Sequence, residues 1–285
     1  DTVASQFTRF KVEPHTPNIG AIIHGIDLSS VSEDSVRVEL RRALAEYQVL
    51  FFRNQKLTPE QQIAVARIFG DPDKAKAFFP RHKTSQLIEL IEAKPGGYSF
   101  GTDQWHADIT FVPNPPTGTV LYSREVPPIG GDTAWASGTR AFDLLDPALK
   151  AYLEGLEAWH SFEHSGWPAW FLSQPGGEEI YRKARADHLP VSHKVIQTHP
   201  VTGRKLIYVS PNFTNRIKGL SRQQSDALLT FLFGLFEKPE VQTRWHWQKD
   251  EVAIWDNRAT VHYAVGDYSD YRLLHRVTFG EDKTF

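Results

Sequence analysis

Histidine and carboxylate side chains are the candidates for chemistry in this chain of 285 residues, because it contains no cysteine. The absence of thiols excludes thiolate nucleophiles, disulfide frameworks, zinc fingers and cysteine-ligated iron–sulfur clusters, so any metal must be held by nitrogen and oxygen. Among the 12 histidines, only His106 has an aspartate two residues later, Asp108. If this segment is extended, both side chains project from one face and can reach one metal ion.

A third candidate ligand, His262, follows residues 251–255, whose apolar character predicts a strand. Two histidines and one carboxylate cover one face of an octahedral metal and leave the opposite face open, which is the arrangement of non-haem Fe(II) oxygenases. His106, Asp108 and His262 could therefore form a catalytic metal site. The alternative is that His106 and Asp108 are spaced in this way by chance.

Two arginines, Arg272 and Arg276, lie four residues apart in a mostly apolar segment. On a strand they point to the same face, about 13 Å apart. Two such side chains are costly to bury without anions, and a guanidinium binds a carboxylate through a bidentate fork. The segment could therefore hold two separate acidic ligands, unless both arginines pair with carboxylates of the protein.

The elements that would position these residues are short strands and a smaller number of helices. Strands are predicted at 7–12, 21–28, 48–53, 87–92, 205–209, 251–255 and 272–279. Helices are predicted from a capping box at 30–33 to residue 47, from a second one at 58–61 to residue 70, over 139–156 with a break at Pro147, and after Ser221. Regular strand–helix alternation is absent, which favours a mainly β fold with helical additions, a sandwich or barrel, in a single domain spanning 1–285.

Composition argues against several kinds of partner. The formal net charge is −2 and no basic stripe is visible, so we expect no nucleic acid. The longest apolar runs are far below the ~20 residues that span a bilayer. Residues 1–7 lack a basic-then-apolar leader pattern. We therefore expect no membrane partner and a cytoplasmic location.

Four motifs occur together and in order: WHADITF at 105–111, GGDTAW at 130–135, WDNRATVH at 255–262 and RLLHR at 272–276. In these motifs the sequence resembles the taurine dioxygenase (TauD/TfdA) family of Fe(II)- and 2-oxoglutarate-dependent dioxygenases, over nearly the whole chain. The resemblance implies a double-stranded β-helix, or jelly roll. It also implies Fe(II) as the cofactor, with 2-oxoglutarate and O₂ as cosubstrates.

The same resemblance implies roles for the residues of the metal and cosubstrate sites. His106, Asp108 and His262 would be the catalytic residues that bind Fe(II). Thr133 and Arg272 would hold the far carboxylate of 2-oxoglutarate, whose keto acid end chelates the iron.

The implied substrate pocket departs from the family pattern. Arg276 would pair with the sulfonate or other anionic group, and Phe213 would line the apolar part of the pocket. Phe79 stands in the place of a tyrosine and Thr102 in that of an asparagine, while Ser165 matches a family serine. These changes leave the metal and cosubstrate residues in place, but they bear on the identity of the substrate.

We therefore expect a small anionic organic substrate, taurine or a related alkanesulfonate, hydroxylated at the carbon next to the anionic group. The products would be sulfite and an aldehyde, with succinate and CO₂. Alternatives are an alkyl sulfate ester or an aryloxyalkanoate with the same cofactors, a zinc hydrolase with the same ligands, and a non-catalytic jelly-roll binding protein. Members of the family often form dimers or tetramers, so a homo-oligomer is expected. The role of Lys76, near the place of a family histidine, is left open.

Overall fold

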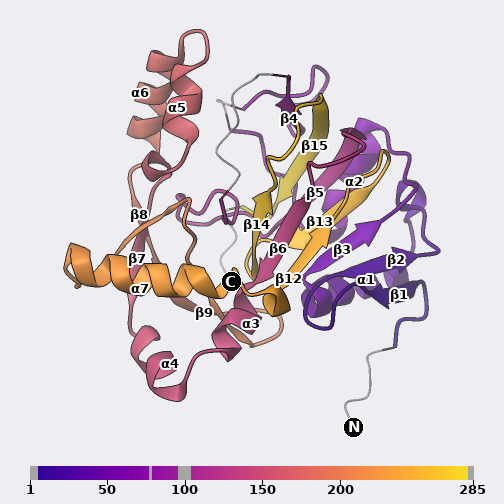
Figure 1. The fold of residues 1–285 in the computed structure, drawn as a ribbon. Helices are drawn as coiled ribbons and strands as arrows, with labels where there is room; N and C mark the ends of the chain where they lie inside the picture. The colour runs from indigo at the N-terminus through magenta and orange to yellow at the C-terminus, as the bar shows by residue number, and fades with distance from the viewer. Residues whose placement is uncertain (1–5, 77–78, 96–103, 282–285) are drawn as a thin grey trace.

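The larger of two facing sheets has seven strands in the order β1-β2-β3-β13-β5-β15-β4 (Figure 1). The structure is a computed structural model and describes residues 6–76, 79–95 and 104–281. Only β2 and β3 are parallel neighbours in this sheet. The strands are β1 (Lys11–Pro14), β2 (Ala21–His24), β3 (Val49–Phe52), β4 (Glu89–Ala93), β5 (Gly118–Glu125), β13 (Val252–Asp256) and β15 (Arg272–Phe279).

Smaller antiparallel sheets complete the β framework of the described residues. One has the order β12-β6-β14, a second the order β11-β7-β8, and a third pairs β9 with β10. Their strands are β6 (Thr133–Ser137), β7 (Glu157–His160), β8 (Val191–Lys194), β9 (Ile196–Thr198), β10 (Lys205–Ile207), β11 (Thr214–Ile217), β12 (Gln242–Trp245) and β14 (Thr260–Ala264).

An aromatic core joins the seven-stranded sheet to the sheet β12-β6-β14. Phe51 of β3 stacks on Trp245 of β12 with ring centroids 4.2 Å apart, and Trp135 of β6 meets Phe51 edge-on at 5.4 Å. All three side chains are buried. Two sheets that pack face to face in this way form the double-stranded β-helix, so the predicted fold class, mainly β with helical additions, is confirmed.

Both faces of the seven-stranded sheet are covered. Alternate residues of β3 point to opposite faces: Leu50 and Phe52 pack with the helices α1 (Asp34–Tyr47) and α2 (Pro59–Phe69), whereas Val49 and Phe51 face the aromatic core. A strand that is buried on both faces has a continuous run of apolar residues rather than alternating apolar and polar residues. The VLFF sequence of β3 is such a run.

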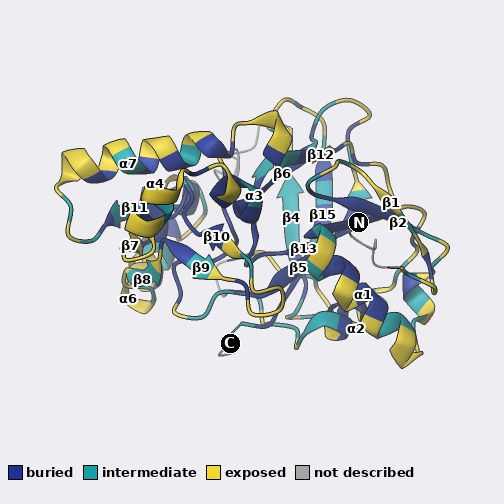
Figure 2. Ribbon diagram, turned by 90° about the horizontal axis from the view of Figure 1, so that it is seen from below, coloured by how far each residue is buried: buried dark blue, intermediate teal, exposed yellow. Residues whose placement is uncertain are grey.

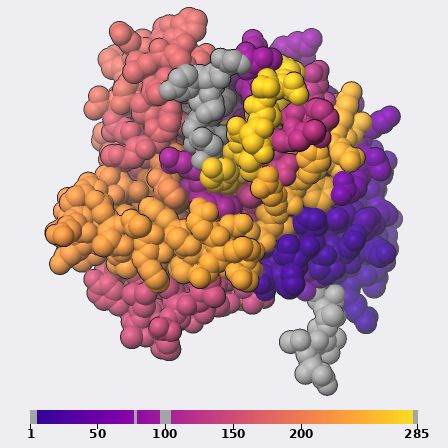
Figure 3. Space-filling model, in the orientation of Figure 1, coloured from indigo at the N-terminus to yellow at the C-terminus, as the bar shows by residue number. Residues whose placement is uncertain are grey.

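The remaining helices lie on the other side of the molecule, beyond the sheet β12-β6-β14 (Figures 1 and 2). They are α3 (Gly138–Asp143), α4 (Pro147–Leu153), α5 (Trp167–Leu172), α6 (Gly177–Asp187) and α7 (Arg222–Leu235), with 3₁₀ turns at η1 (Leu28–Ser30), η2 (Phe162–His164) and η3 (Pro239–Val241). Residues close to the end of the described chain, drawn in yellow, lie at the surface in the view of Figure 3. Within the described ranges, every helix is too short or too polar to cross a membrane.

Several sequence predictions are confirmed and others need correction. The strand at 272–279 is β15, the capping box of α2 forms as expected, and α7 follows Ser221, with a capping box of its own. The capping box at 30–33 was wrong, because residue 30 ends the turn η1 and Glu33 precedes α1 without a side-chain cap. The strand predicted at 7–12 begins at Lys11, and the one predicted at 21–28 ends at His24.

Gly118 begins β5 directly opposite Phe279 of β15. A Cβ atom at this position would lie 2.4 Å from the Phe279 ring and 2.6 Å from the carbonyl oxygen of Trp255. Gly118→Ala is therefore expected to lower the free energy of unfolding by about 1–3 kcal/mol through overpacking, measured by urea denaturation. In the control Gly234→Ala, on α7, the new Cβ meets no atom within 4 Å, and the higher helix propensity of alanine should leave stability equal or raised. Equal losses in both variants would contradict the packing argument.

Candidate active site

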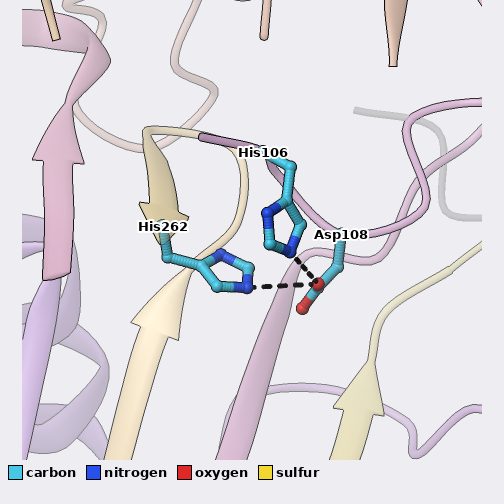
Figure 4. A group of neighbouring side chains, drawn as sticks. All are labelled: His106, Asp108 and His262. Atoms are coloured by element: carbon cyan, nitrogen blue, oxygen red, sulfur yellow. Dashed lines mark ion pairs between the residues drawn. The ribbon is translucent and has the colours of Figure 1, made fainter. Parts of the chain in front are cut away.

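Three buried side chains, His106, Asp108 and His262, converge inside the jelly roll (Figure 4). Their possible ligand atoms all lie within 4.8 Å of one another. Asp108 Oδ1 is 3.8 Å from His106 Nε2 and 3.4 Å from His262 Nε2. The structure thus brings together the three residues predicted as metal ligands, although they are up to 156 positions apart, from 106 to 262.

Backbone pairing places the two histidines side by side. His262 lies on β14, and the N–H of each histidine donates to the carbonyl of the other, at 3.0 and 2.7 Å. The extended conformation expected for 106–108 ends after His106, because Asp108 lies in a turn. The next residue, Ile109, has φ +56°, a left-handed conformation that is rare for a β-branched residue. This turn directs Asp108 back toward the histidines.

His106 is in the neutral form that a metal requires, with Nε2 as the nitrogen that could bind it. His106 Nδ1 lies 2.8 Å from the carbonyl oxygen of Gln104, which can only accept, so Nδ1 carries the proton and Nε2 keeps its lone pair. Burial and the neighbouring His262 lower the pKa of His106 to about 3, so this imidazole is neutral at pH 7. Two imidazole nitrogens and one carboxylate with sites left open suit Fe(II).

Asp108 is held as a carboxylate with one oxygen directed at the histidines. Burial alone would raise its pKa, but His262, together with Arg276, outweighs burial and holds the pKa below its usual value. Its Oδ2 accepts a hydrogen bond of 3.0 Å from the hydroxyl of Thr119 on β5. Oδ1 is therefore the oxygen that faces both imidazoles and could bind a metal.

Asn257 fixes the backbone of Asp108. Its Oδ1 accepts from the Asp108 N–H at 2.7 Å, and its Nδ2 donates to the carbonyls of Asp108 and Pro116 at 2.9 and 3.1 Å. Asp256, by contrast, fixes the turn before β14, because its carboxylate accepts from the backbone N–H of Arg258. Asn257 instead reaches across to the segment that carries Asp108.

Asn257→Ala is expected to weaken metal binding by roughly 10- to 100-fold, the range typical of residues that orient metal ligands. The reason is that the turn carrying Asp108 loses two hydrogen bonds, and the carbonyl of Pro116 loses a third. Titration of the metal-free protein with Mn(II) measures the effect. Asn215→Ala on β11 serves as the control, because this half-buried side chain bonds only to Arg222 among the described contacts. Unchanged Mn(II) affinity in Asn257→Ala would refute the positioning role.

Arg272 is a buried cation without a carboxylate partner among the described residues. One of its terminal nitrogens donates to the carbonyl of Gly131 at 3.2 Å, and its buried Nε has no hydrogen-bond partner. Burial lowers the pKa of Arg272, yet a guanidinium stays charged. Gly131 has φ +71°, and a Cβ there would approach Arg272 Nε to 3.4 Å. A buried guanidinium without a carboxylate in ion-pair contact fits the carboxylate of a ligand.

Thr133 lies on the same side of the fold as His262, one of the three residues that could bind a metal. In β6 it is two residues from Trp135, which is paired directly with His262 of β14, so the three side chains share a face. The Thr133 hydroxyl accepts from the indole N–H of Trp247 at 2.9 Å, which leaves its own proton free to donate. Thr133 and Arg272 therefore approach the interior from two facing sheets.

Arg276 points into the same interior as Arg272 but is not free. Its Nη2 donates to Glu89 Oε2 at 2.8 Å, and its Nη1 is 3.7 Å from Asp108 Oδ1. The alternative raised from the sequence, pairing with a protein carboxylate, thus holds for Arg276 and not for Arg272. Burial raises the pKa of Glu89, while the Arg276 charge opposes that rise. Arg276 Nε is buried without a partner and could still donate to a ligand.

Of the remaining residues predicted for the substrate pocket, two lie at the site and one is bonded within a local turn. Phe79 lies 4.8 Å from the Arg276 guanidinium, and the Phe213 ring lies 6.0 Å from that of His106, so both line the site. The Ser165 hydroxyl donates to the carbonyl of Phe162 inside a local turn. Thr102 lies outside the described residues.

Lys76, whose role was open, forms an ion pair with Glu281 at 2.5 Å. Its ammonium group therefore has a protein partner near the end of the described chain. Sequence reasoning missed Glu89 and Thr119 altogether. No motif marks them, and only the pairing of β4 and β5 with β15 could have placed them near the site.

A jelly roll that encloses two histidines and a carboxylate beside inward-facing arginines defines a non-haem Fe(II) oxygenase. Residues 11–278 match the "Taurine catabolism dioxygenase TauD, TfdA family". The chain belongs to this family and is an Fe(II)- and 2-oxoglutarate-dependent dioxygenase.

Similar proteins cover nearly all of the chain. An alkylsulfatase of Acinetobacter baylyi is 36% identical over 94% of this chain and 84% of its own length. An α-ketoglutarate-dependent sulfate ester dioxygenase of Pseudomonas putida is 34% identical over 94% and 88%. The crystal structure of a taurine dioxygenase from Burkholderia xenovorans matches with a TM-score of 0.81 at 32% identity, covering 96% of this chain and 90% of that one.

Proposed function

We propose that this dioxygenase hydroxylates the carbon next to the sulfur oxyanion of a small organosulfonate, taurine or a related alkanesulfonate. Hydroxylation of that carbon gives a 1-hydroxyalkanesulfonate, whose C–S bond then breaks to leave sulfite and an aldehyde. The oxygen atoms of O₂ end in this product and in succinate, and 2-oxoglutarate loses CO₂. The observation that carries the proposal is the buried Arg276 guanidinium, 3.7 Å from Asp108 Oδ1.

In this proposal His106, Asp108 and His262 hold Fe(II), which supplies O₂ activation coupled to decarboxylation of 2-oxoglutarate. Arg272 binds the far carboxylate of 2-oxoglutarate through its guanidinium, and the Thr133 hydroxyl donates to the same carboxylate. These residues act by positioning, since two fixed donors leave the diacid little freedom to turn. The buried, unpaired Nε of Arg272 supports this role.

Arg276 would bind the sulfur oxyanion of the substrate through its free Nε and so place the neighbouring carbon close to Asp108. Phe79 and Phe213 would pack on the apolar part and exclude water. Phe79, Phe213 and Trp167 belong to one buried aromatic cluster, with Trp167 centroids 5.0 Å from Phe79 and 5.6 Å from Phe213. An apolar wall beside one cation favours a short organic anion over a highly polar one.

A second candidate substrate is an alkyl sulfate ester, because the relatives that are 36% and 34% identical are named for sulfate ester chemistry. Hydroxylation of the carbon next to the ester oxygen would release sulfate and an aldehyde. The same residues would carry both reactions, since a sulfate ester and a sulfonate present the same three-oxygen anion. An aryloxyalkanoate, as named for a relative 31% identical, would instead present a carboxylate.

The deciding experiment incubates the Fe(II)-loaded protein with 2-oxoglutarate, O₂ and a panel of alkanesulfonates, alkyl sulfates and aryloxyalkanoates. We expect succinate formation together with sulfite from the sulfonates. Sulfate release from alkyl sulfates alone would establish the second candidate. Succinate formed only with aryloxyalkanoates would overturn both sulfur-based proposals.

Arg276→Gln is expected to raise the KM of the primary substrate by roughly 10- to 100-fold, because a charge-assisted hydrogen bond is lost. Slow 2-oxoglutarate consumption without that substrate should persist, because Arg272 and Thr133 are untouched. Steady-state kinetics with and without the sulfonate separate the two effects. An equal loss of both activities would show that Arg276 does not act mainly on the primary substrate.

A single catalytic domain over residues 1–285, a dimeric or tetrameric assembly and a cytoplasmic location are further parts of the proposal. The metal ligands lie on a segment before β5 and on β14, and β15 carries both arginines, so much of the chain is needed to build one site. Light scattering on the purified protein would determine the assembly.

A further inference from the structure

Arg276 lies between two carboxylates, and one of them belongs to the metal-ligand cluster. Its Nη2 is 2.8 Å from Glu89 Oε2, and its Nη1 is 3.7 Å from Asp108 Oδ1. The same Oδ1 lies 3.8 Å from His106 Nε2 and 3.4 Å from His262 Nε2. A metal and Arg276 would therefore compete for one oxygen atom.

The strand pairing gives Glu89 the closer approach to Arg276. Glu89 on β4 is paired directly with Arg276 on β15, so their side chains share the inner face. Their exposed fractions are only 2% and 9%, so water screens their attraction poorly. The Phe79 ring lies 4.8 Å from the guanidinium on another side. Together these contacts hold the guanidinium toward β4.

We propose that Glu89 is a positioning residue, which holds Arg276 away from Asp108 and so keeps Asp108 Oδ1 available to the metal. The inference rests on the proposed role of Asp108 as an Fe(II) ligand. Without the Glu89 charge, Arg276 would be a buried cation whose nearest described carboxylate is Asp108. Leaving a buried charge unpaired is costly, so the guanidinium would move toward Oδ1.

The first test titrates Mn(II) alone into the metal-free full-length protein, without 2-oxoglutarate or substrate, and follows free Mn(II) by electron paramagnetic resonance. Glu89→Gln keeps the size of the side chain and removes its charge. We expect its Mn(II) affinity to fall by roughly 10-fold or more, as for other residues that support metal ligands. Glu89→Asp, which keeps the charge, should recover part of the loss.

A double-variant cycle separates positioning from a general effect of charge. If Glu89 acts by restraining Arg276, Arg276→Gln should change Mn(II) affinity little in the native background. The same substitution should restore most of the affinity in the Glu89→Gln background. If the two charges acted independently through the electric field, the effects of the two substitutions on Mn(II) affinity would add to within roughly twofold. Such additivity would overturn the proposal.

The control is another glutamate–arginine pair, in which Nη1 of the exposed Arg53 lies 2.8 Å from Oε2 of the buried Glu251. Glu251 precedes β13, at the end of that strand opposite to the metal-ligand residues. Glu251→Gln should leave Mn(II) affinity unchanged, and a loss equal to that of Glu89→Gln would overturn the proposal. Absence of Mn(II) binding by the native protein would refute the metal site itself, whereas equal binding by native protein and Glu89→Gln would refute only the role of Glu89.

Discussion

Asp108→Ala is expected to abolish activity and to weaken Mn(II) binding by at least about 100-fold, the upper end of the effect of residues that merely support ligands. Asp108 is the only anionic member of the cluster, and its Oδ1 is the atom that faces both imidazoles. Two histidines without a carboxylate would hold a divalent cation weakly. Metal titration and succinate formation measure the two effects independently.

The fold should survive this substitution, because Arg276 retains Glu89 as a partner at 2.8 Å. Circular dichroism and thermal unfolding of the metal-free variant check that expectation. Asp226→Ala, an exposed aspartate on α7 beside Arg222, is the control and should bind Mn(II) like the native protein. Native-like metal binding by Asp108→Ala would remove Asp108 from the metal site.

Arg272→Met should raise the KM for 2-oxoglutarate by roughly 100-fold or more, corresponding to about 3 kcal/mol for a buried ion pair that loses one partner. No carboxylate of the described residues lies in ion-pair contact with Arg272, and the more distant Asp132 is paired with Arg244 and His246, so the substitution leaves no protein anion unpaired. The ligand-free variant should therefore be as stable as the native protein or more stable. Loss of cosubstrate binding with equal or higher stability would be the signature of a ligand-binding charge.

Arg272→Lys tests the geometry of that charge. Lysine keeps the positive charge but lacks the planar fork that binds a carboxylate through two parallel hydrogen bonds. We expect a KM for 2-oxoglutarate between those of the native protein and Arg272→Met. If Arg272→Met instead unfolds at a lower temperature and binds 2-oxoglutarate normally, Arg272 is a structural residue.

Local sequence was enough to predict the elements that depend on local features, such as hydrophobic periodicity or a helix cap. β15 was predicted with its bounds, because Arg272–Phe279 mixes apolar and inward polar positions with period two. The starts of α2 and α7 were predicted because a capping residue and a glutamine three positions later satisfy each other's backbone groups. Residues 30–33 have the same kind of capping pattern, but no capping box forms because the 3₁₀ turn η1 ends at residue 30.

The site was predicted as far as its motifs extend. His106, Asp108 and His262 stand within recognisable segments, and the structure brings them together. Glu89 and Thr119 occupy unremarkable strand positions, and their proximity to the metal ligands depends on which strands are neighbours in the sheet. Such register across distant segments is not encoded in any local pattern, so these residues appear only once the sheet is assembled.

The position of β15 has a consequence for the order of folding. This strand comes last in the described chain, yet it lies inside the sheet between β5 and β4 rather than at an edge. It carries both arginines, and its pairing with β4 brings Glu89 to Arg276. During synthesis β4 and β5 therefore lack the strand that lies between them. The site can be complete only after residue 279 has been synthesised. Such long-range pairing predicts slow folding, with the arginines that would bind the acidic ligands put in place as one of its last steps.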